Sequence, residues 1–70
     1  MKIVNTEYLK EVREEKGYSH RDMSKFLGAK SSATYYNIET GKTEPKASQL
    51  IKISEILKIP IKKILNQKFN

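Results

Sequence analysis

The sequence predicts a compact all-α fold in which five short helices form a single domain over residues 1–70. Apolar residues recur every three or four positions along most of the chain, which is the spacing of one helix face, and alternating strand patterns are rare. Three glycines stand where successive helices are expected to end. With 70 residues there is material for only one small core.

The first two helices are predicted from their end signals. Asn5 or Thr6 caps a first helix, which Gly17 ends. Residues 19–22 resemble a capping box that opens the second helix, and Gly28 ends that helix. The residues predicted to face the core from these helices are Leu9, Val12, Met23, Phe26 and Leu27.

A third helix begins at Ser31 or Ser32, turns Tyr35 and Ile38 inward, and ends at Gly41. The remaining two helices are predicted from prolines, which favour the first positions of a helix. Pro45 or Lys46 starts the fourth helix, and Pro60 precedes a fifth helix that extends to about residue 66. The inward face of the fourth helix consists of Leu50, Ile53 and Leu57.

Composition excludes several classes of protein and favours an anionic partner. The formal net charge is +6, and the last thirty residues hold seven lysines against two glutamates. Cysteine is absent and His20 is the only histidine, so we expect no disulfide, no metal site and no cofactor. No apolar run is long enough for a signal peptide or a membrane span, which predicts a soluble cytoplasmic protein with no membrane partner.

The third predicted helix has an unusual surface. It carries short polar side chains and two adjacent tyrosines, Tyr35 and Tyr36, with Lys30 and Lys42 near its ends. A helix in bulk solvent normally carries more charge, and a core helix has a broader apolar stripe. This pattern favours a helix that lies in the major groove of double-stranded DNA, where base edges offer donors, acceptors and methyl groups.

Several of these stretches together resemble the Cro/C1-type helix-turn-helix family, also called XRE-like or lambda-repressor-like. The resembling stretches are Leu9–Arg13, Gly17–His20, Gly28, Ile38–Lys42, Pro45 and Leu50–Leu57. The resemblance implies a helix-turn-helix over about residues 19–40, with a recognition helix over about 31–40. Between Gly28 and Glu39 the chain has one residue more than the commonest members, and Ser24 stands where a small apolar residue is usual.

The resemblance also implies which side chains contact DNA. The expected base contacts are Ser32, Ala33, Tyr36 and Asn37. The expected phosphate contacts are His20, Lys30, Ser31, Thr34, Lys42 and Thr43. In the family, backbone amides as well as basic side chains usually bind phosphates at the position of Lys42.

Each of these roles has a structural alternative. Ser32 would then only cap a helix, and His20 would be an ordinary surface residue at a helix start. Tyr36 would cover the second helix, and Asn37 would be a solvated amide instead of a bidentate partner of adenine. In the resembling family an arginine of the first helix commonly pairs with a glutamate of the third, which predicts a structural ion pair between Arg13 and Glu39.

The predicted function is that of a sequence-specific transcriptional regulator, a repressor that binds a palindromic operator as a homodimer. Surplus apolar residues near the C-terminus place the dimer interface at Ile56, Ile64 and Phe69. The alternative is that the last helix folds back and buries these side chains. The second functional hypothesis is an antitoxin-like or antirepressor module that binds another protein; an enzyme is not expected, because no catalytic constellation is visible.

Overall fold

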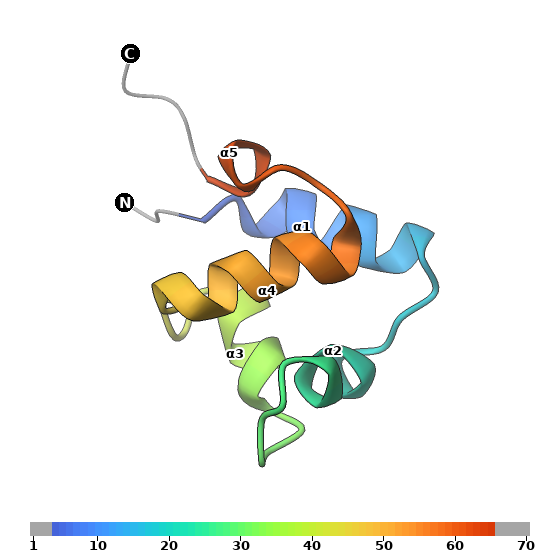
Figure 1. The fold of residues 1–70 in the computed structure, drawn as a ribbon. Coiled ribbons are helices and arrows are strands. Elements are labelled where there is room, and N and C mark those ends of the chain that lie inside the picture. The colour runs from blue at the N-terminus through green and yellow to red at the C-terminus, as the bar shows by residue number, and fades with distance from the viewer. Residues whose placement is uncertain (1–3, 66–70) are drawn as a thin grey trace.

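The computed structural model describes residues 4–65 and contains five helices (Figure 1). They are α1 (Thr6–Glu15), α2 (His20–Phe26), α3 (Thr34–Glu39), α4 (Ala47–Leu57) and α5 (Ile61–Ile64). Extended pairing within the described residues is limited to one isolated antiparallel bridge between Val4 and Leu65. The predicted all-α, five-helix fold is confirmed.

The helix ends follow the capping chemistry that the sequence predicts. The Asn5 side chain accepts a hydrogen bond of 3.1 Å from the Tyr8 amide and thereby caps α1. Ser19 and Asp22 form a reciprocal capping box at the start of α2, with both bonds at 2.9 Å. Gly28 ends the α2 region with a φ of 74°, and a Cβ there would meet no atom within 4 Å. Glycine is therefore favoured by its backbone conformation and not by lack of space.

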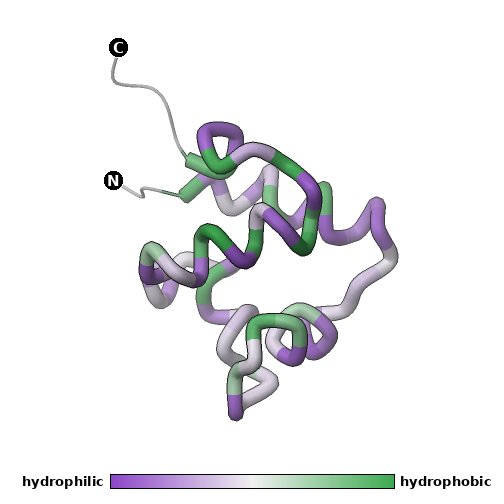
Figure 2. Tube along the Cα trace, in the orientation of Figure 1, coloured by the Kyte–Doolittle hydropathy of each residue, from purple (hydrophilic) through white to green (hydrophobic). Residues whose placement is uncertain are grey.

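The core lies where α1, α3, α4 and α5 meet, and α2 packs mainly against α3 (Figures 1 and 2). Its members are the apolar side chains that turn inward from every helix. The buried apolar residues are Val4, Leu9, Val12, Met23, Leu27, Tyr35, Ile38, Ile53, Leu57 and Ile64. Within residues 4–65 no helix is long and apolar enough to cross a membrane.

Two predicted positions differ from the structure. Phe26, which was expected in the core, is 46% exposed, because its ring lies edge-on against Tyr18 outside the main cluster, with ring centroids 5.2 Å apart. Ile64, which was expected at a dimer interface, has no exposed surface. The chain folds back here: the Asn5 amide donates to the Ile64 carbonyl at 2.7 Å and fixes α5 against α1. The placement of Ile64 in an interface was therefore wrong, and the fold-back alternative describes this residue.

The other two residues of the predicted interface have different positions. Ile56 is half-buried and packs against the core cluster. Phe69 lies outside the described residues. On α4, Ile51 is instead the large apolar side chain that solvent reaches, with 48% of its surface exposed.

Candidate nucleic-acid interface

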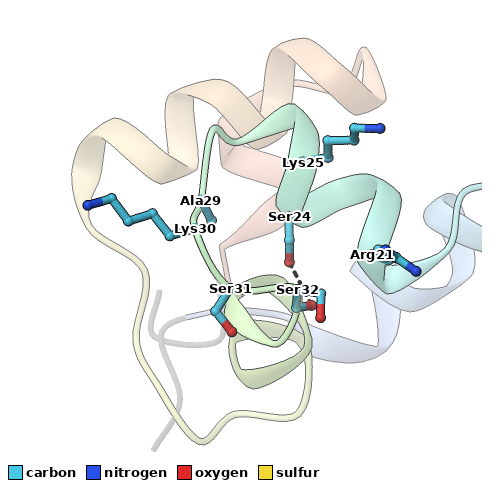
Figure 3. A pocket seen from close by; sticks show the side chains of 7 residues that line it. All are labelled: Arg21, Ser24, Lys25, Ala29, Lys30, Ser31 and Ser32. Atoms are coloured by element: carbon cyan, nitrogen blue, oxygen red, sulfur yellow. Dashed lines mark hydrogen bonds between the residues drawn. The ribbon is translucent and has the colours of Figure 1, made fainter.

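A buried serine joins α2 to the start of α3. Ser24 is 1% exposed, and its hydroxyl donates to the Ser32 carbonyl at 3.0 Å (Figure 3). The same oxygen accepts a hydrogen bond of 2.9 Å from the Tyr35 amide. One side chain therefore satisfies a carbonyl of the turn and an amide of the first turn of α3, which has no side-chain cap of its own. The sequence showed only that Ser24 is small; its polarity at an otherwise apolar position was the available signal.

The turn between α2 and α3 is longer than predicted. The recognition helix was expected from about residue 31, whereas α3 begins at Thr34. Ser31 stabilises the turn: its hydroxyl accepts from the Ala33 amide at 3.1 Å, and its carbonyl accepts from the Thr34 amide at 3.2 Å. Ser31 and Ser32 therefore precede the helix and do not belong to it.

α3 has a buried side and an exposed side. Tyr35, Ile38 and Glu39 point inward. On the opposite side Tyr36 is 45% exposed, and the side-chain amide of the half-buried Asn37 makes no hydrogen bond to another described residue. With the exposed Ala33 that precedes the helix, these side chains form a surface of small polar and aromatic groups.

The backbone after α3 is already hydrogen-bonded. The amides of Lys42 and Thr43 both donate to the Asn37 carbonyl, at 2.9 and 3.1 Å. This closes the helix end and leaves neither amide free for a phosphate. The exposed side chains of both residues are the groups that can reach a ligand.

A buried ionic cluster holds the other end of α3. Arg13 Nε donates to Glu39 Oε1 at 2.8 Å and Nη2 donates to Oε2 at 3.2 Å, so the pair is bidentate. Arg13 Nη1 also donates to the Tyr18 carbonyl at 2.7 Å. Both ionic side chains are less than a tenth exposed. The structure thus contains the ion pair that the resemblance implies, and it links α1 to α3.

His20 is the third member of this cluster. Its Nε2 lies 2.7 Å from Glu39 Oε2, and its ring meets Tyr36 edge-on with centroids 5.1 Å apart. Because a carboxylate only accepts, Nε2 must carry the hydrogen. His20 therefore braces α2 against α3, and its Nδ1 can donate to a phosphate only when both ring nitrogens carry a hydrogen.

The cluster determines the ionisation of its members. Burial alone would raise the pKa of Glu39, but the hydrogen bonds from Arg13 and His20, together with the Arg13 charge, lower it below its ordinary value. The hydrogen bond to Glu39 raises the pKa of Arg13 against the opposing effect of burial. Burial, followed by the negative charge of Glu39, raises the pKa of Tyr35. The carboxylate and guanidinium are thus charged and the phenol is neutral near pH 7.

The surface beside this cluster forms an open hollow of about 300 Å³ with charges of both signs, lined in part by Glu7, Lys10, His20 and Glu39. Among residues 4–65 no three histidine or acidic side chains come together as metal ligands. The arrangement provides a rigid, partly exposed helix with polar groups on its outer side, and it offers no grouping for metal chemistry in this part of the chain.

Comparison with known proteins gives a family and a structural relative. A comparison with curated protein sequences gives no match. Among solved structures, the N-terminal DNA binding domain of SinR from Bacillus subtilis is similar, with a TM-score of 0.76 and 26% sequence identity. The alignment covers 93% of this chain and 94% of that one. A family profile described as helix-turn-helix matches residues 9–64. The chain therefore belongs to the Cro/C1-type, XRE-like helix-turn-helix family.

Proposed function

We propose that the chain is a sequence-specific regulator of transcription that acts as a repressor and inserts α3 into the major groove of double-stranded DNA. The observation that carries the proposal is the outer side of α3: Ala33, Tyr36 and Asn37 present donor, acceptor and apolar groups on a helix whose inner side is fixed. The similar SinR domain is itself named a DNA binding domain, which supports the same role here.

One set of side chains contacts the DNA bases, and a second set contacts the DNA phosphates. Base edges are read by Ser32, Ala33, Tyr36 and Asn37. Phosphates are bound by His20, Lys30, Ser31, Thr34, Lys42 and Thr43. This division matters because phosphate contacts position the protein on any duplex, whereas base contacts determine the sequence that it prefers. Ser31 and Ser32 contribute from the turn, and His20 contributes through Nδ1–H of its doubly protonated ring.

The protein acts as a homodimer on a palindromic operator. One domain of this size offers few base contacts, whereas two copies related by a twofold axis read half-sites about 34 Å apart. With Ile64 buried, the interface moves to α4, where Ile51 is exposed and Ile56 is partly accessible. Burial of these side chains between two copies would remove apolar surface from water. The site of action is the cytoplasm, and no cofactor is required.

Selection of genomic DNA fragments with the purified protein tests this function. The expected result is enrichment of a motif with twofold symmetry, and Asn37→Ala should relax the preference at one position of each half-site. Enrichment without any shared motif would contradict sequence-specific regulation and favour the antitoxin-like or antirepressor module that binds another protein.

The mass of the protein in solution tests the dimer separately. Analytical ultracentrifugation should show a dimer for the wild type and a monomer for Ile51→Lys. Lys52→Gln, at the next position of α4, is the matched control and should remain dimeric. A wild type that is monomeric both free and on its selected operator would contradict the homodimer.

A further inference from the structure

An open hollow of about 340 Å³ lies between α2 and the α2–α3 turn (Figure 3). Arg21 and Lys25 line it from α2, and Lys30 and Ser31 line it from the turn. Arg21 and Lys25 are four residues apart, so they lie on the same side of the helix. No acidic residue lines this hollow, so its charged groups are all positive.

The cations around the hollow are not neutralised by other side chains. Among residues 4–65, Arg21, Lys25 and Lys30 form no ion pair within 4.0 Å, and all three are exposed. Asp22 is the acidic residue next to them on α2: hydrogen bonds from Ser19, followed by the charges of Lys25 and Arg21, lower the pKa of its carboxyl, but neither cation lies within 4.0 Å of it. The positive charge is therefore available to a ligand.

The floor of the hollow is rigid although its rim is open. Ser24 lies at the base and fixes the Ser32 carbonyl and the Tyr35 amide through its two hydrogen bonds. Ser31 fixes the rest of the turn through the Ala33 amide. The wall that carries Lys30 belongs to the turn between α2 and α3.

The hollow between α1 and α3, beside His20, differs in charge. It is lined by Glu7 and Glu39 as well as by Lys10 and His20, and Glu39 is already paired. An anion would meet acidic groups there. The difference selects the hollow at the α2–α3 turn as the one suited to an anion.

We propose that this hollow holds one backbone phosphate of the bound DNA, with Arg21 and Lys25 as its ligands; the Lys30 side chain points away from these two (Figure 3). The inference rests on the proposed function and adds two residues to the interface. The planar guanidinium of Arg21 suits two hydrogen bonds to one phosphate, and Lys25 adds a mobile point charge. The ligand is a DNA phosphate and not a free anion, because exposed cations around an open hollow would have to order a free ion by themselves. A DNA phosphate is already positioned by the rest of the interface.

The test compares two double variants that lose the same charge. Arg21→Gln with Lys25→Gln empties one side of the hollow. Lys52→Gln with Lys63→Gln is the control, since both lysines are exposed and neither lines the hollow. Fluorescence anisotropy with the selected operator and with a random duplex gives Kd between about 50 and 200 mM salt. Far-UV circular dichroism checks that both variants are folded.

Loss of one phosphate contact should make the slope of log K against log salt shallower by about 0.9. Over a fourfold change in salt this reduces the loss of affinity by a factor of about 3.5, since 4 raised to the power 0.9 is about 3.5. The change should be equal on operator and random DNA, because a phosphate carries no sequence information. The control pair should keep the wild-type slope.

Four results would overturn the inference. An equal change of slope in both double variants would mean that only net charge matters. An unchanged slope for Arg21→Gln with Lys25→Gln, while the wild type binds its operator, would exclude phosphate binding in the hollow but would not contradict the proposed function. A wild type that binds no duplex would overturn both. Inorganic phosphate at constant ionic strength is the probe for a free anion: saturable NMR shifts of the residue 29–32 amides, absent in the variant, would replace the DNA phosphate by a free-phosphate site.

Discussion

The two ends of α3 are held by different chemistry. At the N-terminal end a neutral hydroxyl, that of Ser24, bridges the Ser32 carbonyl and the Tyr35 amide. At the C-terminal end the carboxylate of Glu39 is bound by the Arg13 guanidinium and by the His20 ring. Both attachments are buried, but only one of them contains charge.

One short helix is thus held in a fixed position by two kinds of contact, an ion pair at one end and neutral hydrogen bonds at the other. A buried ion pair adds little net stability compared with apolar packing, but removal of one partner is costly because the other charge stays buried. A buried neutral hydrogen bond costs less to break and does not titrate. The charged end should therefore dominate large perturbations and acid sensitivity, and the neutral end should depend on geometry alone.

Glu39→Ala should have the largest effect. It leaves the Arg13 guanidinium buried without its carboxylate, which costs about 3–5 kcal/mol and is enough to unfold most of so small a domain. Urea denaturation followed by far-UV circular dichroism measures the change. Arg13→Met combined with Glu39→Leu should be much milder, because no unpaired charge remains. A midpoint unchanged by Glu39→Ala would contradict a buried pair.

Ser24→Ala should have a smaller but clear effect. It leaves the buried Tyr35 amide and the partly buried Ser32 carbonyl without their partner, at a cost of about 1–3 kcal/mol. Ser48→Ala, at an exposed serine of α4 whose hydroxyl bonds to none of the described residues, is the control and should change stability by less than about 0.5 kcal/mol. Equal losses in the same denaturation experiment would show that the bridge from Ser24 has no special weight.

Asn37 and Lys42, near the charged end of α3, should affect the affinity for DNA in different ways. Asn37→Ala should cost about 1–3 kcal/mol on the selected operator and little on random DNA, as expected for a base contact. Lys42→Ala should weaken binding to both duplexes alike and make the salt slope shallower by about one. Anisotropy titrations on the two duplexes distinguish these patterns. Equal losses on both duplexes for Asn37→Ala would remove it from the base-reading set.

Acid should loosen only the charged end. The pKa of Glu39 is lower in the folded chain than its ordinary value of 4.5. Its contribution to stability is therefore fully present above pH 4.5 and is lost as the pH falls through the lower folded value. The slope from this one group is at most about 1.4 kcal/mol per pH unit. Urea midpoints measured down to about pH 3 should fall less steeply in Glu39→Gln than in the wild type or in Ser24→Ala. Parallel curves for all three would assign the acid sensitivity to other groups.

Local signals in the sequence were sufficient for most of the helix ends, and the family resemblance indicated one attachment of α3. Asn5, Ser19 and the glycines mark helix ends through backbone chemistry that depends on a few neighbouring residues. The pair between Arg13 and Glu39 followed from the family resemblance. Its third member, His20, was expected to contact phosphate, and its hydrogen bond to Glu39 was not predicted.

Other features depend on contacts that no local pattern contains. The late start of α3 follows from the turn geometry at Ser31 and from the bridge by Ser24. The burial of Ile64 and the exposure of Phe26 depend on which element packs above each residue, and periodicity does not identify that element in helices of four to seven residues. The hollow beside Arg21 forms only when the turn and α2 are placed together.

The bridge between Val4 and Leu65 holds the first and last described residues of the chain next to each other. These two residues pair directly, and the Asn5 amide is bonded to the Ile64 carbonyl, so the two ends of the described chain meet at one place. A short linker across this junction would join α5 to α1 without moving either helix. New ends could then open in the exposed segment between α3 and α4, around residues 42–44. In such a circular permutant the same five helices would occur in a different order along the chain. The fold would then not depend on a covalent connection between α3 and α4.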